Sequence, residues 1–293
     1  MLILLADAFD ASLPERLKPF GEVTDDAGRL AEAEVLLIRS KTKATREYLE
    51  RAPRLKLIIR GGVGLDNVDR AYAKERGIRV DNTPDASTVA VAEFALTLML
   101  AAINHVIEGH NGMVQGKFLK KELKRTELFG KTLGLIGVGR IGTAVAQRAK
   151  AFGMRVVGHD PFVAQSAEVE LLGLDAVLSA GDLLSLHAPL TPETRGLLNA
   201  ERLGRTKRGV VIVNTGRGAC VDEPALAAAL QSGQVRCYAT DVWTSDPPPA
   251  DCPLIGLPGV LMAPHLGASS KENLLRIGDE VVQKIAAYAM ESS

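Results

Sequence analysis

The sequence has few cysteines and no net charge, and each of these deficits excludes a class of protein. Its 293 residues include only three cysteines, Cys220, Cys237 and Cys252, which are scattered and lack the spacing of metal ligands. We therefore expect reduced thiols, a cytoplasmic location and no metal site. Thirty-five basic side chains balance thirty-five acidic ones. No whole-protein field gathers nucleic acid or an anionic membrane, so neither is an expected partner.

Long apolar runs are also missing. The most apolar stretch, 89–103, is interrupted by Glu93 and Thr97 and is too short to cross a bilayer. The amino-terminal residues carry no basic leader, and neither repeats nor low-complexity tracts occur. What remains is a chain long enough for two ordinary domains, with the composition of a globular protein.

Residues 1–84 alternate short β-type runs with helical stretches. We expect strands at 2–5, 35–38, 57–59 and 78–80, a weaker one near Val23, and helices around Glu15, Glu47 and Arg70. Such alternation predicts a parallel sheet with helices on both faces. A long helix from about 87 to 105 should follow, and then an irregular basic arm, GKFLKKELKRTEL.

The stretch 131–160, KTLGLIGVGRIGTAVAQRAKAFGMRVVGHD, combines a strand, a glycine turn, a helix and a second strand that ends at an acid. Gly137, Gly139 and Gly142 have the GxGxxG spacing, which lets a backbone turn tightly against a pyrophosphate at a helix amino terminus. Asp160 follows roughly 20 residues later, where a carboxylate binds both ribose hydroxyls and repels the extra phosphate of NADP. The stretch therefore predicts a site for NAD; a glycine-rich packing turn is the alternative.

Four more β-type runs follow Asp160, at 183–187, 210–215, 235–242 and 260–263. Asp222 should cap a helix that has Pro224 in its first turn. Ser269 and Glu272 have the spacing of a capping box for a last helix with one apolar face. We expect an NAD-binding domain at 85–267, inserted into a smaller substrate-binding domain of residues 1–84 plus 268–293. Two crossings between domains suggest a hinge with the active site in the cleft.

Eight segments, taken together and in order, resemble the D-isomer-specific 2-hydroxyacid dehydrogenases, and among them most closely the 3-phosphoglycerate dehydrogenases. These segments are IRSKTKAT, IIRGGVGLDNVD, NTPDAS followed by VAE, GVGRIG, LHAPLT, NTGRGACVDE, DVW and PHLGASS. The resemblance implies an α/β fold of two doubly wound parallel-sheet domains: a Rossmann domain inserted into a flavodoxin-like one. It also implies a short form without the carboxy-terminal regulatory domains of longer members.

The catalytic residues implied by the resemblance are Arg217, Asp246 and His265. Arg217 follows a buried strand, where a guanidinium can bind the substrate carboxylate in bidentate fashion. His265, in Pro-His-Leu-Gly, matches the family's acid–base histidine. Asp246 stands where the family usually has glutamate, one methylene longer. We expect the proline-rich loop after it to lie close enough to His265 to restore the hydrogen bond; a solvated loop aspartate is the alternative.

The remaining histidines are expected in other roles. His105 and His110 follow the long helix as surface or packing residues, and His159 should lie near the adenine. His187 should contact the cofactor, and Asp241 should meet the nicotinamide carboxamide. The expected cofactor-binding residues are Val63, Gly137, Gly139, Arg140, Ile141, Gly142, Asp160, His187, Ala188, Thr215, Gly216, Arg217, Asp241, His265, Gly267 and Ala268.

Two arginines, Arg39 and Arg60, end neighbouring strands and suit a phosphate as well as a carboxylate. The glycine run 61–64 offers backbone N–H groups to an anion. By resemblance, a second subunit adds a basic residue from the arm, for which Lys120 is the nearest match. The expected substrate-binding residues are Arg39, Ser40, Arg60, Gly62, Val63 and Lys120; solvated surface side chains are the alternative. The arm and the long helix should form a homodimer, with a tetramer also open.

The activity predicted is oxidation of 3-phospho-D-glycerate by NAD, to give 3-phosphohydroxypyruvate on the way to serine. Reduction of glyoxylate, hydroxypyruvate or another D-2-hydroxyacid partner is the first alternative. An NAD-sensing binding protein, like the co-repressors that share this fold, is the alternative of another class, and a catalytically dead scaffold is a third.

Overall fold

The computed structural model describes residues 1–291, which form two compact units. One unit joins Met1–Ala90 to the chain from Ala268 onwards, and the other is Val91–Gly267. The boundary expected after residue 84 lies just before a long helix, α4 (Thr88–Asn104), whereas the contacts divide the chain inside the first turn of that helix.

The first unit is built on a five-stranded parallel sheet with the strand order β2-β1-β3-β4-β5. This is the flavodoxin-like order that the resemblance implied. Its strands are β1 (Leu2–Leu5), β2 (Glu22–Thr24), β3 (Val35–Ile38), β4 (Leu57–Arg60) and β5 (Arg79–Asn82). Its helices are α1 (Leu13–Leu17), α2 (Arg46–Glu50), α3 (Arg70–Glu75) and α10 (Lys271–Glu291), with 3₁₀ turns at Lys18–Phe20 and Ala27–Glu32.

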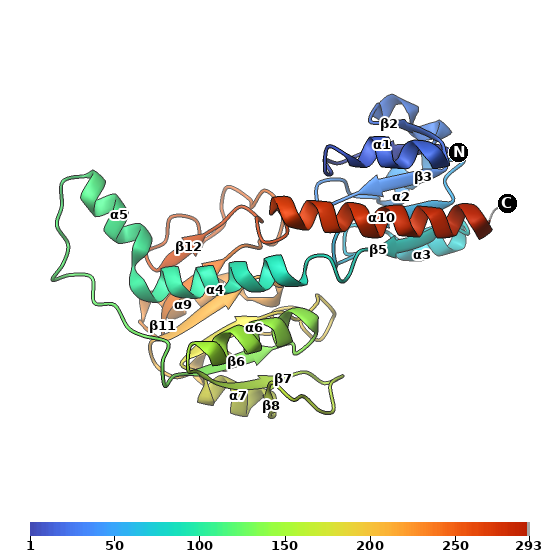
Figure 1. Cartoon of the computed structure of the whole chain (residues 1–293). Coiled ribbons are helices and arrows are strands. Elements are labelled where there is room, and N and C mark those ends of the chain that lie inside the picture. Colours follow the sequence, from blue (N-terminus) through green and yellow to red (C-terminus); the bar gives the residue numbers. More distant parts are fainter. Residues whose placement is uncertain (292–293) are drawn as a thin grey trace. The chain divides into compact units, whose positions relative to one another are not determined.

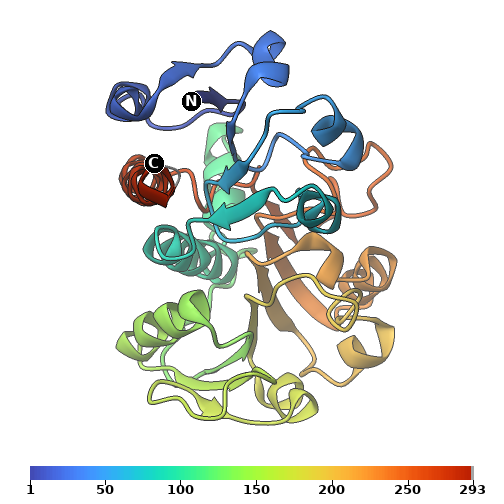
Figure 2. The ribbon, with the colours of Figure 1, turned by 90° about the vertical axis from the view of Figure 1, so that its right-hand side faces the viewer.

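Helices cover both faces of this sheet (Figures 1 and 2). One face packs α1 and α10 against Ile3, Val35 and Ile59, and the other packs α2 and α3 against their neighbours along each strand. Because strand side chains alternate between faces, each buried strand needs apolar residues at every position, as the fully buried run Val35–Ile38 has. The apolar face predicted for α10 is confirmed, since Ile277, Val281 and Ile285 are fully buried.

The capping box predicted for α10 is wrong by one residue. The hydroxyl of Ser270, not Ser269, accepts a hydrogen bond from the Asn273 backbone N–H at 3.2 Å. Asn273 is fully buried and donates to the Ala268 carbonyl at 2.8 Å, so the helix start is fixed by a buried amide rather than by Glu272. Ser269 and Ser270 are adjacent, and the sequence alone does not show which of them caps the helix.

The second unit is a seven-stranded parallel sheet with the order β12-β11-β10-β9-β6-β7-β8. Its order from β8 to β11 is the Rossmann order, with β12 added at the edge. The strands are β6 (Thr132–Ile136), β7 (Arg155–His159), β8 (Glu170–Leu171), β9 (Leu183–Leu186), β10 (Val210–Asn214), β11 (Val235–Thr240) and β12 (Val260–Met262).

Helices also cover both faces of this sheet. The helices besides α4 are α5 (Val106–Val114), α6 (Arg140–Ala151), α7 (Leu174–Ala180), α8 (Ala200–Gly204) and α9 (Glu223–Gln231), with a 3₁₀ turn at Gly218–Cys220. One core cluster joins α4 and α6 to the sheet, and the other joins α7, α8 and α9 to its opposite face (Figure 2). Asp222 caps α9 by accepting from the Ala225 N–H at 3.0 Å, as predicted.

A short helix separates α4 from the basic arm; the sequence assigned no element to that stretch, whereas the arm itself, residues 116–128, is irregular as expected. His105 adopts a left-handed backbone conformation (φ 53°), and the chain then continues as α5 before the extended basic stretch begins (Figure 1). None of the helices among residues 1–291 is by itself long and apolar enough to cross a membrane; α4 and α5, bent by 60° at their junction, meet that criterion only as a pair.

Candidate functional site

The glycine turn between β6 and α6 is shaped by close backbone contacts. Gly137 has φ 95°, and a Cβ there would lie 2.7 Å from the Ala188 backbone nitrogen. At Gly142 a Cβ would lie 2.2 Å from the Gly137 carbonyl oxygen. By contrast, Gly139 faces open space, with no atom within 4 Å of where a Cβ would be. Gly139 is also the N-cap of α6 and provides no side-chain cap, so the first N–H groups of the helix are available to a ligand.

Asp160 directly follows β7 and is held against this turn. Its carboxylate accepts hydrogen bonds from the backbone N–H of Val138, at 2.9 Å, and of Phe162, at 3.0 Å. Each carboxylate oxygen retains a second lone pair for a ribose hydroxyl. The preceding His159 is tied to the Leu172 carbonyl at 3.2 Å. An open glycine, a helix amino terminus and a fixed carboxylate together fit the pyrophosphate and ribose of a dinucleotide. Arg140 and Ile141 open α6 beside the turn.

His187 follows β9 with both ring nitrogens engaged. Nε2 lies 2.9 Å from the Ser185 hydroxyl, and Nδ1 lies 3.2 Å from the Thr215 hydroxyl. Burial lowers the pKa of the imidazole to about 4, because the charged ring loses its hydration and gains no carboxylate partner. This ring is neutral at physiological pH and is unsuited to exchange protons there.

Arg217 lies in a tight turn after β10 that is organised by the fully buried Asn214. The Asn214 amide donates to the Arg217 carbonyl and to the Tyr238 hydroxyl, both at 3.0 Å. Its carbonyl oxygen accepts from the Gly216 N–H, also at 3.0 Å. The half-buried Arg217 guanidinium itself donates to the Gly216 carbonyl at 2.7 Å. The turn therefore holds the arginine at the carboxyl end of a central strand. Asn214 was missed by sequence reasoning, because it lies within the run 210–215 that reads as a buried strand.

His265 lies after β12, and its loop is tied to the end of β11 by Asp241. That carboxylate is 2% exposed and accepts from the backbone N–H groups of Leu266, at 2.6 Å, and Gly267, at 2.7 Å. Burial raises the pKa of Asp241, an effect that the two backbone donors oppose. The sequence assigned Asp241 to the cofactor; within this unit its partners are the residues that follow His265.

Asp246 reaches His265 despite its short side chain. Its Oδ2 lies 2.5 Å from Nδ1 of the imidazole, within hydrogen-bond distance, and both side chains are about one-third exposed. His265 has φ 58°, a left-handed conformation uncommon for residues other than glycine. The expected hydrogen bond is therefore present, with Nε2 left as the other polar atom of the ring.

In the first unit, the expected anion-binding residues surround the ends of β3 and β4. Arg39 follows β3, and its guanidinium donates to the Ala268 carbonyl at 3.2 Å. Arg39 Nε is buried and has no hydrogen-bond partner within the described residues. Burial lowers the pKa of this guanidinium, and Asp7 partly opposes that effect. Ala268, which the sequence assigned to the cofactor, is thus a neighbour of Arg39.

Asp7, which sequence reasoning did not identify, organises the loop that carries Arg39 and Ser40. Its carboxylate accepts from the Arg39 N–H at 2.6 Å and from the Thr42 hydroxyl at 2.7 Å. Asn67 closes the same loop by donating to the carbonyls of Arg39 and Thr42, each at 2.7 Å. A short loop with this many side-chain bonds holds its side chains in place.

The second arginine of this unit packs onto glycine. Gly62 has φ 141°, a conformation that favours glycine, and a Cβ there would lie 1.7 Å from Nη1 of Arg60 as the guanidinium is placed. The Gly62 N–H donates to the buried Thr83 hydroxyl at 2.7 Å, and the next residue, Val63, is 39% exposed.

Lys120 is exposed in the basic arm of the other unit. Over residues 1–291, no group of three or more His, Cys, Asp or Glu side chains is arranged to hold a metal ion.

Comparison with known proteins identifies the family. The model of the D-isomer specific 2-hydroxyacid dehydrogenase NAD-binding domain matches residues 96–267. D-3-phosphoglycerate dehydrogenase from Methanocaldococcus jannaschii is 42% identical over 97% of this chain and 56% of its own length. Hydroxypyruvate reductase from Thermotoga maritima is 46% identical over 87% of this chain and 85% of its own.

Solved structures share the architecture. NAD-dependent formate dehydrogenase from Staphylococcus aureus, in complex with NAD, superposes with a TM-score of 0.88 at 32% identity, covering 98% of this chain and 95% of that one. The chain spans about half the length of the curated phosphoglycerate dehydrogenases it matches. It belongs to the D-isomer specific 2-hydroxyacid dehydrogenase family, and residues 96–267 are its NAD-binding domain.

Proposed function

We propose that this chain is an NAD-dependent dehydrogenase that oxidises 3-phospho-D-glycerate to 3-phosphohydroxypyruvate, a step toward serine. The observation that carries the proposal is the His265–Asp246 pair, at 2.5 Å, on a loop tethered by buried Asp241 at the carboxyl edge of the NAD-binding sheet. The similarity to phosphoglycerate dehydrogenases at 42–45% identity supports the choice of substrate.

The roles follow from the chemistry of each side chain. Arg217 binds the substrate carboxylate and polarises the adjacent oxygen. Nε2 of His265 accepts the hydroxyl proton as the alcohol becomes a ketone, and returns it in the reverse direction. Asp246 accepts from Nδ1, which fixes the tautomer and stabilises the imidazolium that forms. When bound, NAD would supply the acceptor for the hydride that leaves the substrate carbon.

The cofactor is held, in this proposal, by the residues around the glycine turn and along the carboxyl edge of the sheet. The turn holds the pyrophosphate and Asp160 the ribose, while neutral His187 and Thr215 line the nicotinamide side. Asp241 serves first as the tether of the His265 loop. Its assignment to the nicotinamide carboxamide, together with the contacts of Val63, Gly267 and Ala268, remains part of the proposal.

Arg39 and Arg60 bind the substrate phosphate in this proposal. They follow or end adjacent strands, since Ile38 pairs with Arg60 in the β3–β4 ladder. The buried, unsatisfied Nε of Arg39 needs an acceptor, and a phosphate oxygen supplies one. Lys120 of a second subunit adds charge.

The second candidate is reduction of hydroxypyruvate or glyoxylate, favoured by the 46% identity to the hydroxypyruvate reductase. Arg39→Ala separates the two. If the phosphate assignment is right, the KM for phosphohydroxypyruvate rises at least 10-fold while the KM for hydroxypyruvate changes less than 2-fold, with kcat retained for both. Equal changes for both substrates would reject the assignment.

A binding protein that senses NAD is the candidate of another class. Steady-state turnover with NADH and phosphohydroxypyruvate decides between it and an enzyme. If the chain binds NADH but turns over none of a panel of 2-oxo acids, the enzyme hypothesis is rejected and the NAD-sensing protein is the reading that remains.

We also propose an assembly and a cellular location for the chain. The chain acts as a homodimer in which the long helix α4 and the basic arm form the contact, and α5, which lies between them in the chain, adds to it. It works in the cytoplasm, because Cys220, Cys237 and Cys252 are free thiols, as in proteins of reducing compartments.

A further inference from the structure

A second charged site lies at the edge of the NAD-binding sheet opposite to the glycine turn. Lys131 precedes β6, Asp182 precedes β9, and Lys207 and Arg208 precede β10, so these residues sit at the amino-terminal ends of parallel strands. Arg236 is the second residue of β11. The candidate catalytic residues all follow the carboxyl ends of such strands. A strand of five residues rises about 3.3 Å per residue, which separates the two edges by roughly 13–16 Å.

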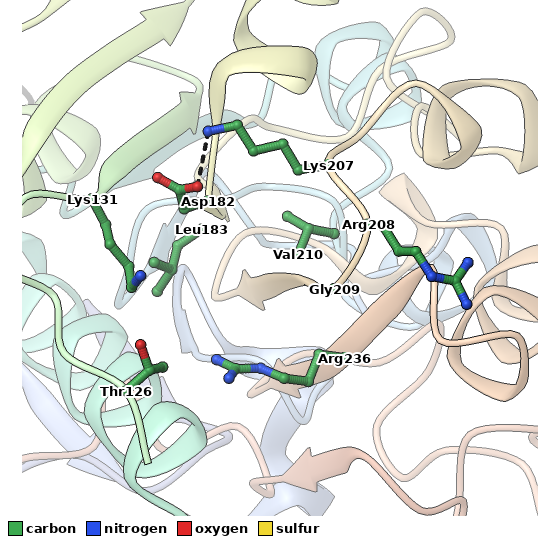
Figure 3. A pocket seen from close by; sticks show the side chains of 9 residues that line it. All are labelled: Thr126, Lys131, Asp182, Leu183, Lys207, Arg208, Gly209, Val210 and Arg236. Atoms are coloured by element: carbon green, nitrogen blue, oxygen red, sulfur yellow. Dashed lines mark hydrogen bonds and ion pairs between the residues drawn. The ribbon is translucent and has the colours of Figure 1, made fainter. Parts of the chain in front are cut away.

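These residues line a hollow of about 150 Å³ together with Thr126, Leu183, Gly209 and Val210, and we call it the basic pocket (Figure 3). A single water needs only about 10–15 Å³ of such space. The pocket therefore has room for a polyatomic ion with several waters, or for the phosphate end of a small metabolite. Four cations and one carboxylate line it, so its formal charge is about +3.

The carboxylate in the pocket is already satisfied. Asp182 accepts from Nζ of Lys207 and from the Thr132 backbone N–H, each at 2.8 Å. Burial disfavours the charged carboxylate, but those two donors and nearby Lys131 prevail and lower its pKa. Arg208 is also engaged, since its guanidinium donates to the Ser232 carbonyl at 2.8 Å. Lys207, Arg208 and Asp182 thus form the framework of the pocket.

The other two cations of the pocket, Lys131 and Arg236, are not part of this hydrogen-bonded framework. Within the described residues neither side chain donates a hydrogen bond or forms a salt bridge; Lys131 lies near the Asp182 carboxylate, which Lys207 and the Thr132 N–H already engage. Figure 3 shows the Lys131 ammonium, the Thr126 hydroxyl and the Arg236 guanidinium directed toward one another, on the side of the pocket away from the Lys207–Asp182 pair. Two positive groups that converge without a shared acceptor repel each other, and an anion between them removes that cost.

We propose that the basic pocket binds a phosphate group, held by Lys131, Arg236 and Thr126, at a site separate from the catalytic edge. A dianionic tetrahedral oxyanion matches the residue set: two cations neutralise its charge, the guanidinium presents paired donors and the hydroxyl adds a third. Inorganic phosphate and the phosphate of a small phosphorylated metabolite share this chemistry.

The test is phosphate titration of the full-length protein with NAD at saturating concentration, so that the glycine turn is already filled. Calorimetry at low ionic strength should give binding at the pocket with Kd at or below about 1 mM. Lys131→Gln with Arg236→Gln should abolish that binding or weaken it at least 10-fold. A control with two cations removed elsewhere in the unit, Lys150→Gln with Arg155→Gln, should bind as the parent does; these two residues pair with Glu168 and Glu170, outside the pocket.

Arg39→Ala removes the anion site proposed for the substrate and keeps the two proposals apart. Compared with the parent, Arg39→Ala should bind one phosphate fewer per chain. The pocket variant, Lys131→Gln with Arg236→Gln, should also bind one fewer, and the variant with all three substitutions should bind none. An unchanged isotherm in the pocket variant, or no pocket binding up to about 10 mM phosphate in the parent, would overturn the proposal. Repeating the titration with glycerol 3-phosphate identifies the source: tighter binding than inorganic phosphate indicates a metabolite, and equal binding indicates the free ion. Unchanged NAD affinity shows that each variant is folded.

Discussion

The proposed acid–base pair depends on the reach of one carboxylate. Asp246 is one methylene shorter than the glutamate usual at this position in the family, yet it contacts Nδ1 of His265. In Asp246→Asn an amide replaces the carboxylate and cannot stabilise the imidazolium, so kcat should fall by about 10–100-fold with little change in KM. Steady-state kinetics with NADH and the 2-oxo acid measures this. Asp246→Glu keeps the charge and should retain more than a tenth of the activity; an Asn variant as active as the parent would remove Asp246 from the mechanism.

Asp160 is the residue that we expect to govern the choice between NAD and NADP. Its carboxylate is fixed against the glycine turn by two backbone donors, so it cannot swing away from an incoming 2′-phosphate. Asp160→Ser removes the repulsion, and the ratio of kcat/KM for NADP to that for NAD should rise by about 10–100-fold, which corresponds to about 1.4–2.7 kcal/mol. An unchanged ratio would show that the ribose lies elsewhere. Thermal unfolding of the same variant checks that the turn has kept its fold.

The lowered pKa of His187 should make the free energy of unfolding depend on pH. Its pKa is about 4 in the folded chain and about 6.5 in the unfolded chain. Below pH 6.5 the unfolded chain binds a proton that the folded ring does not, so the free energy of unfolding falls as the pH drops toward 4. The full effect is about 3 kcal/mol, and above pH 6.5 the ring contributes nothing. Urea unfolding of the parent and of His187→Gln at pH 4.5, 5.5 and 7.5 should give a difference that grows with acidity; parallel curves would contradict it.

At the level of elements, two glycines of the turn should have different roles, one in folding and one in binding NAD. A methyl at Gly142 would collide with the Gly137 carbonyl, whereas one at Gly139 meets only open space. Gly142→Ala should therefore lower the free energy of unfolding by about 1–3 kcal/mol. Gly139→Ala should leave the melting temperature unchanged but weaken NAD at least 10-fold, because the pyrophosphate needs that space. Thermal melts and NADH fluorescence titration measure the two effects. Equal losses of stability in both variants would contradict the assignment.

The elements found from sequence are those with a period or a fixed motif. The buried strands, the glycine turn, the Asp222 cap and the apolar face of α10 all depend on neighbours in the chain, and local pattern encodes them. Helix α5 was missed because the chain restarts after a left-handed His105, and nothing local signals that break. Asp7 was missed because its partners lie in a loop that the sheet brings close to it. Asn214 was missed because it lies in a run that reads as a buried strand, and nothing local shows that its side chain bonds the turn after that strand. Asp241 was found, but not as the tether of the His265 loop, since that contact spans 25 residues.

At the level of the whole molecule, one parallel sheet offers two edges of different chemistry. The carboxyl edge of the second unit carries the glycine turn, His187, Arg217 and the Asp241-tethered loop, where open α/β sheets bind their ligands. The amino edge carries the basic pocket. A parallel arrangement makes this separation unavoidable, because every strand begins at one edge and ends at the other.

The exposed apolar side chains of the second unit predict that the chain forms a homodimer. Helix α5 and the arm after it expose Val106, Ile107, Met113, Val114 and Phe118, between 49% and 74% of each side chain. Such a cluster of apolar side chains marks a contact surface, and a self-complementary one gives a two-fold dimer. Val114→Asp with Phe118→Asp places two charges in that contact and should give monomers of 31.2 kDa by light scattering, whereas we expect the parent to be a dimer. Phe162→Asp, at a site 92% exposed outside this cluster, should leave the dimer intact. A dimer that survives the double substitution, or a monomeric parent, would show that α5 and the arm do not form the contact.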